Sequence, residues 1–203
     1  MSDFSDDYPG PFAMPYLKKD QRMFHAREIA GLIAGRGDDI SKLTTEIRGY
    51  ITRGYIIPLG RDADDGRGAL LFSVDAIFVA AALRAATDLG LAGKDKLERL
   101  ALALQMWTGN PGEGAPRNPA TFILLTYMQD LRPHGFSVEL HASRHIDTGA
   151  LALWAAVRHG DHGLIGEGAV IVPDHHMPVA AAVVPLDDLA ARIVMNLNRR
   201  KAH

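Results

Sequence analysis

Residues 44–58 read TTEIRGYITRGYIIP and carry the strongest structural signal in the chain. They complete an apolar stripe at three- and four-residue spacing, which predicts an amphipathic helix over residues 40–52. Gly54 ends this helix, and Asp38 and Asp39 precede it with side-chain oxygens that can cap its first turn. The stripe consists of Ile40, Leu43, Ile47 and either Tyr50 or Ile51.

The segments on both sides extend this pattern. Upstream, residues 27–34 predict a shorter helix that the sequence Gly35-Arg36-Gly37 brings to an end. Downstream, residues 55–59 and 70–72 have the composition of strands, and the turn-rich sequence GRDADDGRG between them predicts a hairpin with a long exposed tip. Two more helices are predicted, over residues 74–89 with Ser73 as the cap and over residues 94–108.

The most evident boundary in the chain is the stretch GNPGEGAPRNP, rich in glycine and proline. The fold class is therefore predicted as α+β with two domains. The predicted parts are a flexible arm over residues 1–16, a first domain over 17–108, a linker over 109–119 and a small α+β domain over 120–203.

The last of these parts gives weaker local signals. Residues 121–128 are apolar and fit either a buried strand or a helix, and periodicity does not decide between them. Strands are predicted over residues 136–141 and 179–184, and a final helix over 186–198. Further apolar runs lie at residues 151–157 and 169–172.

Composition narrows the range of functions. The chain has 203 residues, of which 47% are apolar, and this is enough to bury a core. The formal net charge is -2, so any surface that binds nucleic acid has to be local. The absence of cysteine excludes disulfides and thiolate metal sites, and no signal segment or membrane-spanning apolar run is evident. We expect a soluble, cytoplasmic protein.

The order of helix, turn, helix, hairpin and helix over residues 24–90 suits a unit that presents one helix to the major groove of DNA. Three segments resemble the DNA-binding domain of the MerR family of transcriptional regulators: FHAREIAGLIAG, TTEIRGYITRGYIIP and LLFSVDAIFVAAALRAATDLGL. The resemblance covers residues 24–91. It implies a winged helix-turn-helix fold, sequence-specific binding of double-stranded DNA and a role in transcription, without an enzymatic activity.

Candidate DNA contacts follow from residue type and position. Short hydroxyl side chains reach phosphates or base edges, and arginine pairs with guanine through two hydrogen bonds. The polar positions of the second helix, the arginines beside the hairpin and the lysines before the first helix are therefore candidates. They are Ser41, Lys42, Thr44, Thr45, Arg48, Arg53, Arg61, Arg67, Lys18 and Lys19. A homodimer is expected, with RNA polymerase or another regulator as a further partner.

Two other functions stay open at this point. The hairpin tip carries Asp62, Asp64 and Asp65, which repel phosphate and favour a winged helix that docks a protein as an adaptor. A metal- or ligand-binding protein based on histidine is the second alternative. Its candidate residues are His145, His159, His162, His175 and His176, with Asp147, Asp161 and Asp174 nearby in sequence. Cofactor motifs for phosphate or dinucleotide binding are not found in the sequence.

Overall fold

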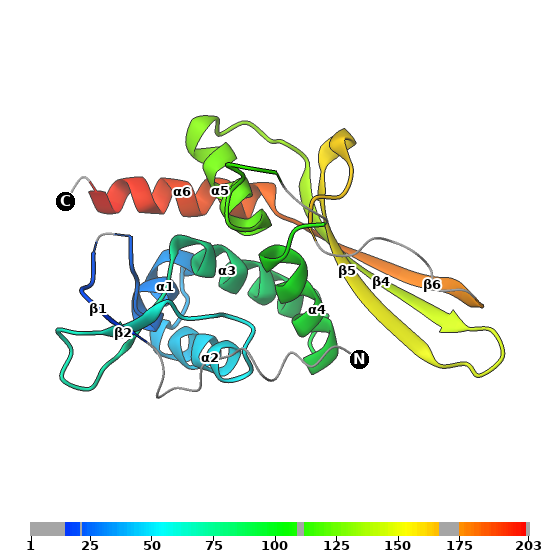
Figure 1. Cartoon of the computed structure of the whole chain (residues 1–203), viewed down its shortest axis with the longest axis horizontal. Helices are drawn as coiled ribbons and strands as arrows, with labels where there is room; N and C mark the ends of the chain where they lie inside the picture. The colour runs from blue at the N-terminus through cyan, green and yellow to red at the C-terminus, as the bar shows by residue number, and fades with distance from the viewer. Residues whose placement is uncertain (1–14, 21, 109–111, 167–174, 202–203) are drawn as a thin grey trace. The chain divides into compact units, whose positions relative to one another are not determined.

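The computed structural model describes residues 15–20, 22–108, 112–166 and 175–201. The chain divides into two compact units, Met1–Ala76 and Ile77–His203, each of which contains a three-stranded sheet (Figure 1). The predicted arm lies outside the described residues up to position 14, and the predicted linker over residues 109–119 falls within the second unit.

The first unit begins with two helices, α1 (Ala26–Ile33) and α2 (Ile40–Thr52), which contact each other. Both have a buried apolar side, with Ile29 and Ile33 on α1 and Leu43 and Ile47 on α2. The bounds of α2 are the predicted ones. The stripe that was read from the sequence is therefore the buried side of a real helix.

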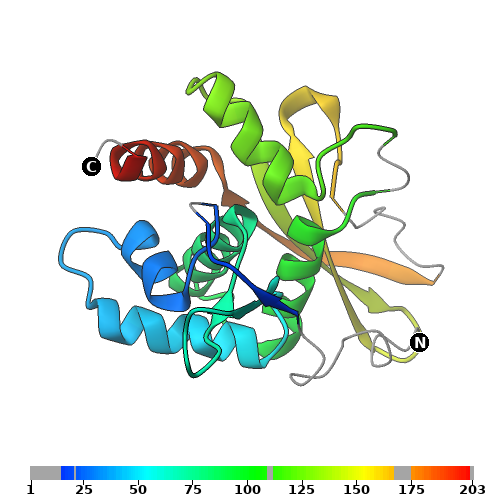
Figure 2. The ribbon, with the colours of Figure 1, turned by 60° about the vertical axis from the view of Figure 1, so that its left-hand side comes forward.

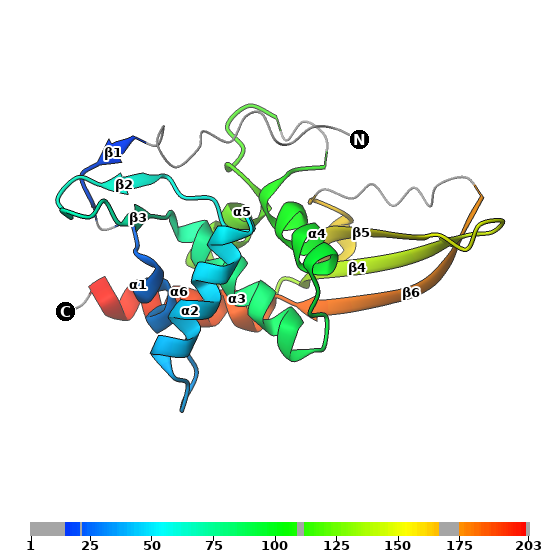
Figure 3. The same ribbon diagram turned by 90° about the horizontal axis from the view of Figure 1, so that it is seen from below.

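A small sheet accompanies these helices, with strand order β1-β2-β3 (Figure 3). It consists of β1 (Tyr16–Leu17), β2 (Gly60–Asp62) and β3 (Leu70–Leu71). β2 pairs in parallel with β1 and antiparallel with β3. Just outside these strands, Phe24 and Phe72 exchange two backbone hydrogen bonds of 2.9 Å. These bonds tie the start of α1 to the segment that leaves the hairpin.

The prediction of a strand over residues 55–59 is wrong. The first strand of the hairpin is β2, at Gly60–Asp62, within the stretch that was assigned to the exposed tip. Tyr55 and Ile56 are consecutive residues and both are buried. Because successive side chains of a strand point to opposite faces, two buried neighbours fit an irregular core segment better than a strand with one solvated face. Pro58 also lacks the N–H that a ladder needs.

Helix α3 (Val74–Asp88) follows the hairpin, and the division between the units falls within it. The second unit also contains α4 (Lys94–Gln105), α5 (Pro119–Gln129) and α6 (Asp187–Lys201). The segment that the sequence left open between strand and helix is α5. Asn118 accepts a hydrogen bond of 2.8 Å from the Thr121 N–H, and Pro119 occupies the first turn, so the helix begins with two favourable residues.

The sheet of the second unit is antiparallel, with strand order β5-β4-β6 (Figure 2). Its strands are β4 (Phe136–His145), β5 (Leu151–His159) and β6 (His176–Pro185), and a short 3-10 helix, η1 (Gly160–His162), follows β5. Helix α4 contacts β4 and β5, and α5 contacts α6. The apolar run predicted at residues 169–172 lies outside the described residues.

The α+β class predicted from the sequence is confirmed, since helices and two small sheets occur together. Among the described residues, no helix has the length and apolar character required to cross a bilayer.

Candidate nucleic-acid interface

Helix α2 presents a continuous polar side. It begins with a cap in which Asp39 Oδ1 accepts hydrogen bonds from the backbone N–H groups of Ser41 (2.8 Å) and Lys42 (3.2 Å). This bonding satisfies two amides that would otherwise lack an intrahelical partner. The cap fixes where the helix begins, and packing of the apolar stripe decides which side chains face outward.

The exposed side chains of α2 follow the helical repeat. Ser41, Thr45, Arg48 and Thr52 are separated by four, three and four positions and are all exposed, so they form one stripe along the helix. Lys42 and Arg53 are exposed beside it. The hydroxyls of Thr45 and Thr52 donate to the backbone oxygens of Ser41 (3.0 Å) and Arg48 (2.9 Å). Both hydroxyl oxygens remain able to accept a hydrogen bond from outside.

Thr44 does not belong to this stripe, contrary to the prediction. Only 7% of its surface is exposed, and its hydroxyl donates to the Ile40 oxygen over 2.7 Å. Position 44 lies next to Leu43 and three residues before Ile47, both of which are buried. A helix turns by about 100° per residue, so a polar residue at the margin of the apolar stripe can fall on the buried side. We therefore remove Thr44 from the candidate contacts.

The other cationic candidates divide into available and engaged side chains. Lys18, Arg53 and Arg67 are exposed. Arg61 instead bonds across the hairpin, since its guanidinium donates to the Gly68 oxygen over 2.9 Å. Lys19 forms an ion pair with Glu28 at 2.9 Å. Arg61 and Lys19 therefore form contacts within the first unit and are less available to a ligand.

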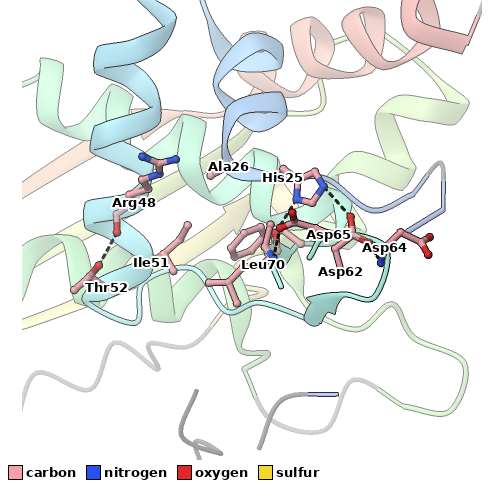
Figure 4. Close-up of a pocket in the computed structure, with 11 residues that line it drawn as sticks. His25, Ala26, Arg48, Ile51, Thr52, Asp62, Asp64, Asp65 and Leu70 are labelled. Atoms are coloured by element: carbon pink, nitrogen blue, oxygen red, sulfur yellow. Dashed lines mark hydrogen bonds and ion pairs between the residues drawn. The ribbon is translucent and has the colours of Figure 1, made fainter. Parts of the chain in front are cut away.

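An open pocket of about 780 Å³ lies between α2, the start of α1 and the hairpin (Figure 4). Arg48, Ile51 and Thr52 line it from the side of α2. His25 and Ala26 line it from α1, and the hairpin contributes three carboxylates. The carboxylates are those of Asp62, Asp64 and Asp65. Arg48 of the exposed stripe therefore lines the same pocket as the acidic part of the hairpin.

Two of these carboxylates are engaged in bonds within the hairpin. Asp62 is 6% exposed, its Oδ2 lies 3.1 Å from His25 Nε2, and its Oδ1 accepts from the Asp64 N–H over 3.0 Å. Asp65 Oδ2 accepts from the Ala69 N–H over 2.7 Å. Asp64 is exposed, and its carboxylate points away from Arg48 in Figure 4. The aspartates thus shape the hairpin as well as charging it.

Arg48 keeps its guanidinium available despite this acidic neighbourhood. Within the described ranges, no carboxylate lies at ion-pair distance from it, and its backbone oxygen is the group that bonds with Thr52. Since no described carboxylate pairs with it, Arg48 is free to bind an incoming anion, although the three nearby aspartates make the local potential less positive.

The contact between His25 and Asp62 is a feature that sequence reasoning missed. Apart from Asp62, His25 also approaches the hairpin through Nδ1, which lies 3.2 Å from the Leu70 oxygen. The two residues are distant in sequence, and no local pattern couples them. The Asp-Ala-Asp sequence was a usable signal for the turn alone, since aspartate often accepts from the amide two residues on.

The five candidate histidines of the second unit form two groups. The ring of His145 lies 5.0 Å from that of His176 and 6.2 Å from that of His175, and His159 lies 4.7 Å from His162. His145 Nδ1 accepts from the N–H groups of Asp147 and Thr148. Among the residues that the structure describes, no group of three or more side chains is arranged to hold a metal ion, and Asp174 lies outside them.

Acidification is expected to destabilise the second unit through His159. Burial, together with the nearby His162 and His134, lowers the pKa of His159 below its ordinary value of 6.5. As the pH falls, the unfolded chain then takes up the proton first, so this contribution to stability is complete above pH 6.5 and is lost progressively below it.

The variant His159→Phe keeps a ring against Phe136, whose centroid lies 4.2 Å away, and removes the titration. The thermal midpoint of each protein is measured at about pH 8 and about pH 5. Between these pH values the midpoint of His159→Phe should fall less than that of the unaltered protein, because the contribution of His159 is absent. Equal falls for the two proteins would contradict the assignment.

Comparisons of the chain with models of protein families, with curated proteins and with solved structures find no match.

Proposed function

We propose that residues 24–91 form a winged helix-turn-helix of the kind found in MerR regulators and that the chain binds double-stranded DNA to regulate transcription. The observation that carries the proposal is the exposed stripe on α2, with an Arg48 guanidinium that no carboxylate of the described residues holds. In this proposal α2 is the recognition helix, and the hairpin β2–β3 is the wing that lies beside it.

The dimensions of α2 support this assignment. It has 13 residues, which corresponds to about 20 Å of helix and suits one pass through a major groove. Ser41 and Thr45 would reach phosphate or base edges near its start, and Arg48 would follow one turn later. Arginine at such a position gives the most discriminating contact, since its two donors match the two acceptors of guanine.

The bonding inside the wing reduces the objection that its tip is acidic. Asp62 and Asp65 direct their oxygens to His25 and to backbone amides, so two of the three carboxylates are not aimed at a ligand. Lys42, Arg53 and Arg67 remain exposed around them and are suited to phosphates. The balance of charge nevertheless predicts a modest affinity that depends steeply on salt.

The test is a binding experiment with the full chain. Duplexes selected from a random library of about 30 base pairs should bind, with an affinity that falls as salt rises. The variant Arg48→Ala is expected to weaken binding to the selected sequence by about 10- to 100-fold, because one bidentate base contact is lost. Fluorescence anisotropy of labelled duplex measures both effects.

The matched control is Arg99→Ala, which removes the same charge from an exposed position of α4 in the second unit. This variant should bind within about twofold of the unaltered protein, since its charge lies outside the proposed interface. If Arg48→Ala also binds normally, α2 is not the recognition helix. If no selected duplex is retained at about 50 mM salt, the DNA-binding proposal fails.

The acidic pocket favours one second candidate. The exposed Asp64, in a pocket that the engaged Asp62 and Asp65 also make acidic, suits a cationic segment of another protein, as the adaptor hypothesis requires. Ile51, Leu70 and Phe72 add apolar surface to the same pocket. The charge of Asp64 discriminates between the two functions, because its removal strengthens contact with DNA and weakens contact with a basic peptide.

A further inference from the structure

Strand β6 is an unusual edge. It lies at one side of the sheet of the second unit, and its ten residues, HMPVAAAVVP, include no Lys, Arg, Asp or Glu. Val179 and Val183 are 46% and 53% exposed. Edge strands are normally short or charged, which prevents pairing with other chains. A long apolar edge of this kind is therefore suited to a partner strand.

The other edge of the same sheet is partly covered. Ile165 donates a backbone hydrogen bond of 2.8 Å to the Val157 oxygen of β5, and Arg158 and Leu164 form an isolated bridge. Within the described part of the chain, β6 pairs with β4 and with no other strand. In Figure 1, the ends of β4 and β6 far from α6 extend beyond the helices of their own unit.

The backbone groups that face outward from β6 follow from the register. Leu186 donates to the Phe136 oxygen over 3.0 Å, and Val184 pairs with Val138 next along the ladder. In an antiparallel pair the residues that bond to the neighbour alternate, so Ala180, Ala182 and Val184 bond toward β4. Ala181 and Val183 consequently direct their N–H and C=O groups to the open edge.

The two prolines obey the same alternation. Pro185 follows Val183 in the outward phase, where the absence of an N–H costs the ladder no bond. At the other end, the register shifts between Ala142 and Ser143, and Pro178 pairs with Ser143 after the shift. The uninterrupted outer edge therefore runs from Ala180 to Val184, with a proline beyond each end.

We propose that β6 pairs antiparallel with β6 of a second copy of this chain, about a two-fold axis at Ala182, which makes one six-stranded sheet from two protomers. Ala181 of each copy then lies opposite Val183 of the other. These two residues exchange both of their outward bonds, so the pairing makes four backbone hydrogen bonds and uses every outward group between Ala180 and Val184.

The sizes of the side chains favour a second copy of β6 as the partner strand. In the proposed register Val183 faces Ala181 and Val184 faces Ala180 of the second copy, so each bulky side chain lies opposite a small one. Ala182 faces its own counterpart at the axis, where a pair without direct hydrogen bonds brings the backbones to about 4.5 Å. In this register the two-fold axis repeats each large–small pair on both sides, so a second copy of β6 fits along the whole edge from Ala180 to Val184.

The pairing is short, so the dimer is expected to be weak. Five paired residues bury less than the roughly 1,200 Å² of a stable complex, and we expect a dissociation constant of about 10–100 µM. Sedimentation velocity of the full chain without DNA should show monomers at about 1 µM and dimers at about 500 µM. Monomers at all concentrations would overturn the proposal.

Paired substitutions test the register. A181K/V183K places like charges opposite each other across the axis and is expected to raise the dissociation constant by at least about tenfold. A181K/V183E makes the same exposed positions charged but places opposite charges face to face, and it should dimerise again in a manner that salt weakens. The proposal fails if the two variants behave alike.

Two further measurements separate this edge from other surfaces. Leu151→Lys alters an exposed residue of β5, at the opposite edge, and should leave the dimer unchanged. Hydrogen exchange should slow at the Ala181 and Val183 amides on dimerisation, while Ala180 and Ala182 are already protected by β4. Disruption by Leu151→Lys, or no slowing at Ala181 and Val183, would contradict pairing through β6. No readout depends on DNA, so the outcome is independent of the proposed function.

Discussion

Gly166→Ala is expected to destabilise the second unit by about 3 kcal/mol or more. A Cβ atom at position 166 would lie 2.8 Å from both Cβ and Cγ2 of Val157 and closer still to the backbone oxygen of Ala103. The first neighbour is a buried β-branched side chain with no room to rotate, and the second belongs to α4. Neither neighbour can shift at low cost in free energy, so the segment around Gly166, strand β5 or helix α4 must move.

Backbone bonds hold Gly166 in this position. It forms an isolated bridge with Trp107, its N–H donates to the Val157 oxygen over 3.3 Å, and its own oxygen accepts from the Thr108 hydroxyl. An alanine cannot retreat from the clash without breaking part of this network. The result is overpacking combined with lost hydrogen bonds, which is why we expect one of the largest effects of any conservative change in the chain.

Tryptophan fluorescence measures the destabilisation caused by Gly166→Ala. Its two tryptophans, Trp107 and Trp154, both lie in the second unit, so their fluorescence during denaturant unfolding follows that unit. Gly31→Ala is the matched control, because a Cβ there meets nothing within 4 Å and the residue lies within α1. It should stabilise α1 by up to about 1 kcal/mol. An unchanged fluorescence midpoint for Gly166→Ala would contradict the packing described above.

The sequence predicted those elements whose signals are local. The bounds of α2 were readable because Asp39 marks its start and the apolar stripe repeats at helical spacing. Helix α5 was left open because its apolar residues surround the helix, but Asn118 before it and Pro119 in its first turn carried enough information to decide. The strand over residues 55–59 was wrong because composition alone does not separate a strand from a buried irregular segment.

The candidate interface was predictable to the same extent. Exposure of Ser41, Thr45 and Arg48 follows from helical spacing, and the structure agrees. Thr44 failed because its position at the margin of the stripe depends on how α2 is rotated against its neighbours, which spacing does not fix. The contact of His25 with Asp62 joins distant segments and depends on how the hairpin folds back onto α1, so no local pattern could supply it.

Asp62→Ala and Asp64→Ala are expected to change DNA binding in opposite directions, although each removes one carboxylate from the same hairpin. Electrostatics alone predicts that both variants bind DNA more tightly, since each loses a charge that repels phosphate. For Asp64 this argument is sufficient, because the residue is exposed and its carboxylate is directed away from the rest of the pocket. We expect about a two- to fivefold gain in affinity at low salt, which shrinks as salt rises.

Asp62 is buried, and its two oxygens bond His25 and the Asp64 amide. Removing it leaves His25 Nε2 and the Asp64 N–H without these partners, which costs about 1 kcal/mol, since His25 is only partly buried and Asp64 is exposed. The hairpin then loses one of the contacts that hold it against the start of α1, while the Phe24–Phe72 backbone bonds and the approach of His25 Nδ1 to the Leu70 oxygen remain. We therefore expect Asp62→Ala to lower the affinity for DNA by about fivefold or more. The wing is then less ordered in the free protein, and the free energy needed to order it is subtracted from the free energy of binding.

Hydrogen exchange over residues 60–71 and anisotropy of labelled duplex measure the two effects separately. Faster exchange for Asp62→Ala, with unchanged exchange for Asp64→Ala, supports the structural role of Asp62 whether or not the chain binds DNA. If exchange behaves in this way but neither variant alters duplex binding, the hairpin is not a DNA-binding wing. If both variants gain affinity equally, the hairpin acts through its charge alone, and the bonds of Asp62 do not position it for the ligand.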